Sequence, residues 1–287
     1  MWIIFSLVSA FAGATRSAIS KKLLATADEY ITSWAVWFFG LPILFVALIF
    51  YGLPAHIGNS FWIILLLNAF LNIVASLFFM KSLKSAPISL VAPILSLTPI
   101  FVAIASPILI RELPSTLGLI GILLAVIGAY FLNITHVKSG VFKPFCALFE
   151  NEGCRYGLLV AALWGMTSNL DKIAIQNSSP IFYLVCLHLF ISFLFLLILR
   201  YRKTSNVNLS ATNSKNFFYL GSIYALMLVF QMLAIQLSLV SYVLSIKRMD
   251  ALFSIGYGYF LFKEANIKER LAGTVMLLLS IILIAFA

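Results

Sequence analysis

Apolar stretches long enough to cross a membrane recur along the whole chain, and they limit the possible folds more than any other feature. A helix needs about 20 residues to cross the hydrocarbon core of a bilayer. Of the 287 residues, 63% are hydrophobic and only 10% are charged, whereas soluble domains are roughly 45–50% apolar and about 25% charged. These proportions exclude a water-soluble globule, a disordered chain and a small secreted disulfide scaffold.

Proline, glycine, asparagine and charged residues divide the apolar sequence into ten predicted membrane-spanning helices. The predicted spans are Trp2–Lys22, Thr32–Tyr51, Phe61–Ser82, Pro87–Ile110, Ser115–Ile134, Arg155–Gln176, Ile181–Arg200, Phe217–Ser238, Val240–Phe262 and Asn266–Ala287. We therefore expect an all-α membrane protein. A polar stretch separates its two halves, which predicts a five-helix unit at 1–135, a linker at 136–154 and a second five-helix unit at 155–287.

The two halves repeat each other. The segment Ser17–Lys21 aligns with Ser168–Lys172. At one constant offset, Phe101, Glu112 and Gly121 of the first half align with Phe253, Glu264 and Gly273 of the second. Five is an odd number of spans, so the second copy enters the membrane from the opposite side. Inverted repeats are typical of secondary transporters, whose substrate site lies near the membrane midplane between the copies.

Several short segments in this order carry a family resemblance. They are Trp164, Ser168–Lys172, Ser241–Arg248, Leu252–Ser254, Lys263–Glu264 and Gly273. On this hydropathy profile, the chain resembles the EamA-like branch of the drug/metabolite transporter superfamily over nearly its whole length. The resemblance implies two inverted five-helix repeats around a central cavity. It does not imply a substrate, because the superfamily moves amino acids, drugs, sugars, nucleotides and phosphate esters.

The predicted ninth span carries the richest group of ionisable residues. An ionisable side chain at the centre of a membrane helix costs about 2.5–3.5 kcal/mol on insertion scales, so it is kept only beside a cavity or a partner. Lys247, Asp250, Ser254 and Tyr257 share one helical face. We expect Lys247 to pair with Asp250 at i,i+3, which would leave Arg248 for an anionic substrate. The alternative is that the charges form an internal lock between helices.

Four further polar residues complete the predicted substrate site. Arg16 is a second intramembrane cation, and Asn72, Asn169 and Gln231 follow polar stripes on their spans. The alternative for the three amides is hydrogen bonding between packed helices.

Other polar residues are expected to be structural. Asp171 and Lys172 are predicted to lie near a helix end, where they could reach the membrane interface at little cost. Glu112 and Glu264 precede the fifth and tenth spans, where a carboxylate suits the positive end of the helix dipole. His188, with Ser192 one turn later, is expected to be a packed residue, and a proton relay is the alternative.

The loop charges and the family resemblance predict opposite orientations in the membrane. Lys and Arg gather in the loops after the first, third, fifth, seventh and ninth spans, and Arg111 and Lys172 are the exceptions on the opposite side. Short loops rich in Lys and Arg stay cytoplasmic, which favours both termini outside. The family resemblance implies both termini in the cytoplasm. The net charge of +10 is thus expected to face the cytosol and anionic lipid rather than nucleic acid.

We predict a secondary transporter of a small organic anion or zwitterion that bears a carboxylate or phosphate. The sequence contains no metalloprotease, nucleophile-elbow, Walker or dinucleotide-binding motif, so we expect neither an enzyme nor a cofactor. Expected partners are the substrate, the lipid bilayer and a coupling proton or counter-substrate, with the chain acting as a monomer or homodimer in the inner or plasma membrane. The alternatives are an exporter of amino acids or cationic drugs, and a membrane scaffold that transports nothing.

Overall fold

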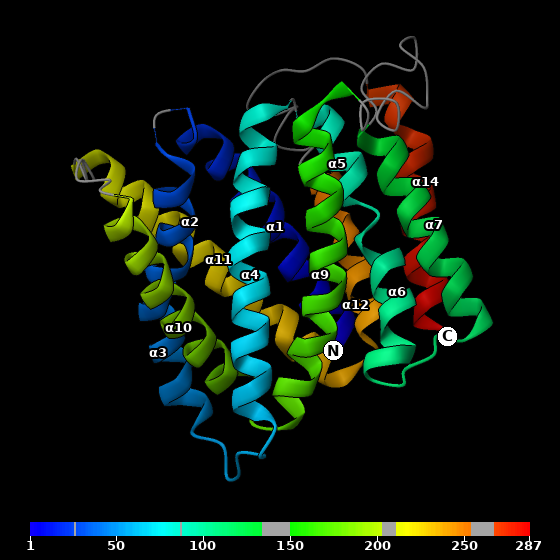
Figure 1. Ribbon diagram of the computed structural model, residues 1–287. Coiled ribbons are helices and arrows are strands. Elements are labelled where there is room, and N and C mark those ends of the chain that lie inside the picture. Colours follow the sequence, from blue (N-terminus) through cyan, green and yellow to red (C-terminus); the bar gives the residue numbers. More distant parts are fainter. Residues whose placement is uncertain (26, 87, 134–149, 203–210, 254–266) are drawn as a thin grey trace.

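The computed structural model describes residues 1–25, 27–86, 88–133, 150–202, 211–253 and 267–287, and these residues form helices joined by short turns (Figure 1). The helices are α1 (Trp2–Leu23), α2 (Glu29–Phe38), α3 (Leu41–Tyr51), α4 (Phe61–Ser85), α5 (Ile88–Leu95), α6 (Thr98–Leu109), α7 (Thr116–Asn133), α9 (Glu152–Gln176), α10 (Pro180–Tyr201), α11 (Ala211–Leu237), α12 (Val240–Ile246), the 3-10 helix η2 (Lys247–Met249) and α14 (Ile267–Ala285). The prediction of an all-α membrane fold is confirmed.

Capping residues start two helices about one turn earlier than hydropathy predicts. The Asp28 carboxylate accepts a hydrogen bond from the Tyr30 amide at 2.8 Å, and the Asn151 side chain accepts one from Gly153 at 2.8 Å. Each cap satisfies an amide group that has no partner within its helix. Helices α2 and α9 therefore begin in polar sequence, before the apolar residues that predicted them.

Two of the predicted spans are each built from two helices. The second span consists of α2 and α3, which are separated at Phe39 and Gly40, and the fourth consists of α5 and α6, which are separated at Ser96 and Leu97. Proline follows each break, as Pro42 and Pro99. Proline has no amide hydrogen, so it cannot bond to the carbonyl four residues before it. A hydropathy profile does not reveal such breaks, because the sequence stays apolar across them.

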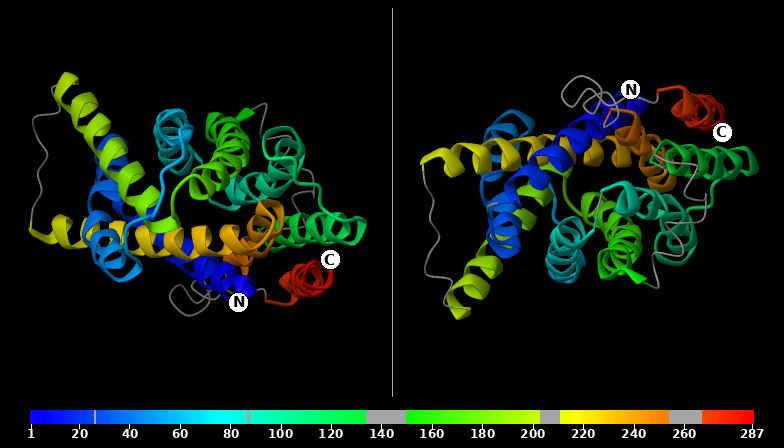
Figure 2. Two further views of the ribbon diagram at one scale, coloured as in Figure 1. Left: turned by 90° about the horizontal axis from the view of Figure 1, so that it is seen from below. Right: turned by 90° about the horizontal axis from the view of Figure 1, so that it is seen from above.

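The helices pack with the symmetry of an inverted repeat. The two halves correspond as α1 with α9, α2 and α3 with α10, α4 with α11, α5 and α6 with α12 and η2, and α7 with α14. Helix α1 packs extensively on α11, and its counterpart α9 packs in the same way on α4. The remaining helices meet their own counterparts, as α2 with α10, α6 with α12, and α7 with α14. Figure 2 shows α7 and α14 side by side at one end of the bundle.

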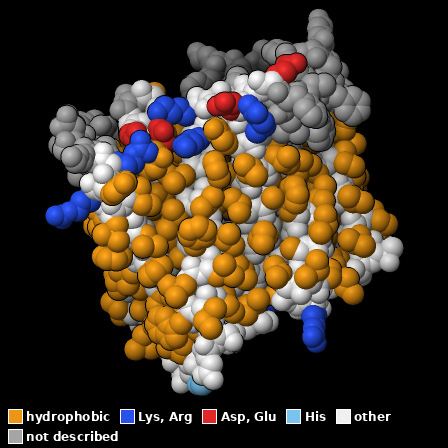
Figure 3. Space-filling view, in the orientation of Figure 1, with side chains coloured by type: hydrophobic (Ala, Val, Ile, Leu, Met, Phe, Trp, Pro, Cys, Tyr) orange, Lys and Arg blue, Asp and Glu red, His pale blue; other side chains and the backbone are white. Residues whose placement is uncertain are grey.

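The outer surface suits a lipid environment. Large apolar side chains cover the middle of the molecule, and charged side chains gather at one end (Figure 3). Ile49, Ile63 and Ile108 are each more than 70% exposed. Within the described residues, seven segments are long and apolar enough to cross a membrane, and the shorter helices Thr116–Leu132 and Gly273–Ala285 are also apolar. The chain is a multi-pass membrane protein.

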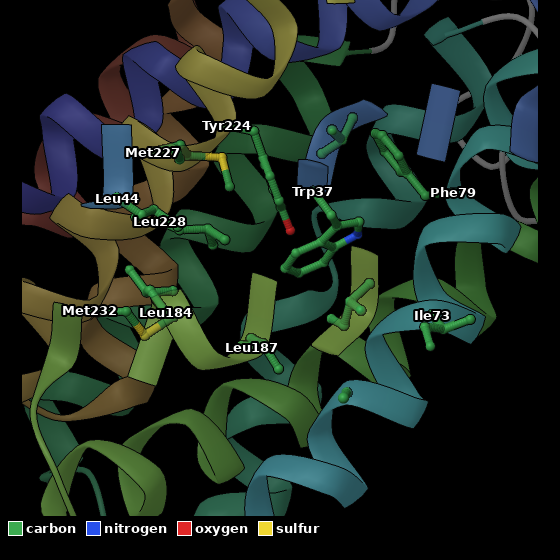
Figure 4. Packing of buried hydrophobic residues seen from close by; sticks show 14 of the residues in the cluster. Trp37, Leu44, Ile73, Phe79, Leu184, Leu187, Tyr224, Met227, Leu228 and Met232 are labelled. Atoms are coloured by element: carbon green, nitrogen blue, oxygen red, sulfur yellow. The ribbon is translucent and has the colours of Figure 1, made fainter. Parts of the chain in front are cut away.

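The largest hydrophobic cluster among the described residues includes side chains of α1–α4, α6 and α9–α12, and contacts among α2, α4, α10 and α11 form part of it. Trp37 from α2 packs edge-on against Tyr224 from α11, with ring centroids 5.1 Å apart (Figure 4). The Trp37 indole N–H donates to Ser76 Oγ on α4 at 3.1 Å. His188 from α10 lies against Trp37, and its Nδ1 is 2.9 Å from the Leu184 carbonyl oxygen. This cluster holds α11, and with it Tyr224 and Met227, against the centre of the bundle.

Close helix packing at the α7–α14 contact should make Gly273 sensitive to a single added methyl group. A Cβ atom at Gly273 would lie 2.7 Å from the Gly128 carbonyl oxygen and 2.9 Å from the Leu132 amide nitrogen, and backbone atoms cannot rotate away. Gly273→Ala should lower the free energy of unfolding by about 1–3 kcal/mol, measured by thermal or denaturant unfolding in detergent. Gly13→Ala is the matched control, since its Cβ would meet no atom closer than 3.5 Å. Equal stability of the two variants would contradict this packing.

Charge distribution predicts the orientation in the membrane. The C-terminal turns of α1, α4 and α10 carry Lys21, Lys22, Lys84 and Arg200, and both termini of the chain lie toward the other end of the bundle (Figure 1). A reporter enzyme that is active only in the cytosol should be silent when it is fused after Ala287. The same reporter inserted after Arg202 should be active. The opposite pattern would contradict the orientation predicted from charge.

Candidate functional site

Two adjoining cavities lie at the centre of the bundle, between the two repeats. The first cavity is lined by residues of α1, α4, α5, α7, α9, α11 and η2, by Ser96 after α5, and by Asp250 and Ala251 in the helical residues after η2. About 790 Å³ of it, including open solvent, is free of protein atoms. The second is lined by α1, α4, α9, α11, α12 and η2, with about 440 Å³ counted in the same way. Both cavities are lined by Arg16, Trp164, Met227, Lys247 and Arg248. The basic residues therefore stand where the two cavities meet.

Helix breaks at equivalent positions of the two repeats create this meeting point. In the sequence alignment, Leu95 and Ser96 correspond to Lys247 and Arg248. Helix α5 ends at Leu95, and α12 gives way to the 3-10 helix η2 at Lys247. Interrupted helices in corresponding positions of two halves mark the binding site in many inverted-repeat transporters. The break therefore belongs to the repeated architecture, whereas the charges are present in the second repeat alone.

Arg248 is anchored by the break in the other repeat. Its NH1 donates to the Leu95 carbonyl oxygen at 3.0 Å. That carbonyl also accepts a hydrogen bond from Thr98 Oγ1 at 2.7 Å. The carbonyl is open to these side chains because Pro99, four residues on, has no amide hydrogen to offer it. Arg248 thus joins the two broken helices across the molecule.

The prediction that Lys247 pairs with Asp250 is wrong. Lys247 Nζ donates instead to Gln231 Oε1 on α11. Asp250 Oδ2 lies 3.8 Å from Arg248 NH2. A lysine side chain is long enough to reach across a helix interface, so spacing along one helix does not fix its partner. Asp250 and Lys247 both lie near Gly13 of α1, where a Cβ atom would be 3.9 Å from Asp250 Cβ and 4.0 Å from Lys247 Cε, at ordinary contact distance.

Arg16 is held by aromatic rings rather than by a carboxylate. Its guanidinium carbon lies 4.3 Å from the ring centroid of Tyr224, 4.6 Å from that of Phe79 and 5.9 Å from that of Trp164. Such cation–π contacts stabilise a desolvated cation. Arg16 is 6% exposed, and its Nε has no hydrogen-bond partner within the described part of the chain. A buried donor of this kind is suited to an anionic ligand.

The remaining predicted site residues fall into three groups. Gln231 and Asn72 line the second cavity, and Asn72 donates to Asn68 Oδ1 at 2.9 Å. Asn169 lines neither cavity. Its amide oxygen accepts a hydrogen bond from Ser106 Oγ at 2.7 Å, which joins α9 to α6. Ser254 and Tyr257 lie outside the described residues.

Asp171 is the main functional candidate that the sequence analysis missed. It is 6% exposed and lines the second cavity, so its expected place at the membrane interface is wrong. Its Oδ1 accepts hydrogen bonds from Tyr183 Oη at 2.6 Å and from Asn68 Nδ2 at 2.7 Å. The signal available in the sequence was the polar stripe of α4, which predicts a polar partner for Asn68 but does not identify it.

Lys172 and Glu112 form an ion pair between the repeats. The pair lies at the end of the bundle opposite the charged face, which is the end that carries Lys21, Lys22, Lys84 and Arg200. Lys172 Nζ contacts Glu112 Oε1 and donates to the Ser238 carbonyl oxygen at 2.8 Å. Glu112 Oε2 accepts from the Val240 amide at 3.3 Å. Lys172 is 8% exposed rather than reaching the interface as expected. The pair links α9, the turn after α6 and the turn before α12.

Comparisons with known proteins assign the family. The chain matches the EamA-like transporter family at residues 1–134 and again at 151–286. A search of curated proteins gave no match, whereas 29 chains of solved structures match. One of them, described only as the crystal structure of a protein, aligns with a TM-score of 0.72 and 13% identity over 99% of this chain and 95% of that chain. It shows the same fold. Together with the ten-span inverted-repeat architecture, the double match shows that the chain belongs to the EamA-like transporter family, a group of membrane transporters of the drug/metabolite type.

Proposed function

We propose that the protein is a secondary transporter of a small organic anion or zwitterion whose carboxylate or phosphate group binds where the two cavities meet. The observation that carries the proposal is an excess of buried positive charge. Among the described residues, the cavities are lined by Arg16, Lys247 and Arg248 against Asp171 and Asp250. A buried charge without compensation is costly, and an anionic substrate would supply the compensation.

The chemistry of these cations favours carboxylate and phosphate ligands. A guanidinium presents a planar fork of N–H donors that matches either group. Arg16 and Arg248 each have a buried Nε without a hydrogen-bond partner in the part of the chain that the structure describes. Phe79, Trp164 and Tyr224 already face Arg16, so they are less available to a cationic drug.

Alternating access would use the two repeats as rocking units around this site. The first cavity lies among residues near the ends of α1 and α4 that reach the charged face, such as Ser17 and Leu83. The second lies deeper, and the Glu112–Lys172 pair links the repeats beyond it. Opening the second cavity to the opposite side would require this pair to separate. We propose that the protein works in the inner or plasma membrane as a monomer or homodimer.

Flux into proteoliposomes tests the proposal. Purified protein should carry one or more small carboxylates or phosphate esters from a panel that also contains neutral amino acids and quaternary amines. Competition among panel members should then rank anions above cations. Transport of quaternary amines alone would favour the cation exporter, and no flux of any compound by protein that remains folded would favour a scaffold.

A further inference from the structure

Asp171 occupies a special position in the second cavity. Its carboxylate is held in place on one side, where Oδ1 accepts from Tyr183 on α10 and Asn68 on α4. Asn68 also donates to the Tyr183 hydroxyl oxygen at 2.5 Å and to the Thr167 carbonyl oxygen at 3.3 Å. Oδ2 has no hydrogen bond from the described residues. Asp171 is therefore rigidly placed, with one oxygen left to take a proton.

The effect of the Asp171 charge on the cavity depends on the groups that surround it. Helix α10 contributes Tyr183 and α11 contributes Tyr224, both as hydroxyl groups. The cations are Lys247 and Arg248 on η2 and Arg16 on α1, which line the same cavity. Helix α4 presents only the amides of Asn68 and Asn72, and α5 and α6 have no ionisable side chain. Among the described residues that line this cavity, Asp171 carries the negative charge and the other charged side chains are positive.

We propose that Asp171 is a proton-binding site that couples transport of the anion to movement of a proton in the same direction. This inference rests on the proposed function. A proton from water in the cavity binds Oδ2 and later returns to water on the other side of the membrane, and no other bond changes. Protonation removes one negative charge beside Arg16, Lys247 and Arg248, so the site attracts an anion more strongly.

Thermodynamic linkage makes the effect reciprocal. If the proton raises the affinity for the anion, the anion raises the affinity of Asp171 for the proton by the same factor, which is typically about 5- to 150-fold. Affinity for the anion should therefore rise as the pH falls, by up to about tenfold per pH unit for one coupled proton. The protein would carry both or neither, which is symport.

Infrared difference spectroscopy on the full-length protein tests proton binding without any substrate. Acidification should produce a carboxylic-acid band that is lost in Asp171→Asn. Glu29→Gln is the matched control, since Glu29 pairs with Lys84 at 2.6 Å on the charged face and should leave the band intact. Tyr183→Phe removes a donor to the carboxylate, which disfavours its charged form, and should move the transition to higher pH. If Asp171→Asn kept the band unchanged, the proposal would be overturned. If Asp171→Asn does not fold, Tyr183→Phe provides the test: a band that appears at the same pH as in the wild type would overturn the proposal.

Binding and flux then test the coupling, with glycerol 3-phosphate and succinate as probes. Asp171→Asn should bind either probe as tightly at alkaline pH as the wild type does at acidic pH. It should retain exchange of labelled for unlabelled probe but lose accumulation driven by a proton gradient. Wild-type pH dependence that persists in this variant would overturn the coupling. Failure of every small anion to bind the wild type would instead defeat the proposed function, whereas the infrared band would still report the proton on Asp171.

Discussion

Replacing Arg248 with alanine should weaken binding of the transported anion by about ten- to a hundredfold while the protein remains folded. Loss of a charge-assisted hydrogen bond in a desolvated site costs about 1.5–3 kcal/mol. The fold should tolerate the change, because the Leu95 carbonyl oxygen keeps its hydrogen bond from Thr98. Calorimetry on detergent-purified protein measures the affinity, and thermal unfolding confirms that the variant is folded.

Two controls separate a binding role for Arg248 from a structural one. Arg248→Lys should restore little affinity, because a lysine ammonium cannot reproduce the paired donors of a guanidinium. Arg202→Ala removes an exposed arginine that packs over the Tyr30 ring at 3.9 Å, far from the cavities in sequence and fold, and should leave the affinity unchanged. If Arg248→Ala bound the anion as tightly as the wild type, Arg248 would be a packing residue and the anion assignment would be wrong.

Breaking the Glu112–Lys172 pair should change which side of the membrane reaches the cavities. The side chains are 17% and 10% exposed, and removing one partner leaves the other charge poorly compensated. Lys172→Met should destabilise the conformation with this end closed by about 1–3 kcal/mol, which shifts its equilibrium population by roughly 5- to 150-fold. Thr167 lines the second cavity. In a Thr167→Cys background, an impermeant thiol reagent added on the side of the membrane where the Glu112–Lys172 pair lies should then label the introduced thiol faster.

A double-variant cycle isolates the pair itself. Lys172→Met combined with Glu112→Leu removes both charges, so its labelling rate should fall back toward that of the parent protein. Cys186, which is half-buried on α10, should be replaced in every background. Additive effects of the two substitutions would show that the ion pair does not hold this end closed.

The fold was largely predictable because its main determinants are local. Length and hydropathy located the spans, and an odd number of spans per repeat predicted the inversion. The helix breaks at Gly40 and Ser96 were not predicted as breaks, since the chain remains apolar there and proline alone permits either a bend or a full interruption. The start of α9 was misplaced because Asn151 caps a polar first turn that hydropathy excludes.

The site was predictable only in part, because partners between helices depend on packing. Sequence predicted that Arg16, Lys247 and Arg248 need a cavity or partner, and all three line both cavities. It assigned Lys247 to Asp250, the nearest acid on its own helix, whereas the structure pairs it with Gln231 of α11. Asp171 was overlooked because a short distance to the helix end suggested exposure, yet α4 and α10 bury it.

Determining where a transported anion binds tests the proposed anion site between the two cavities. The structure of the protein with an anion that it carries in proteoliposomes should place the carboxylate or phosphate within hydrogen-bond distance of Arg248, with Arg16 or Lys247 as a second contact. Asp171 should lie in the same cavity without touching the anionic group. A carried substrate found elsewhere in the fold, or a cationic substrate bound to the Asp171 carboxylate, would contradict the account.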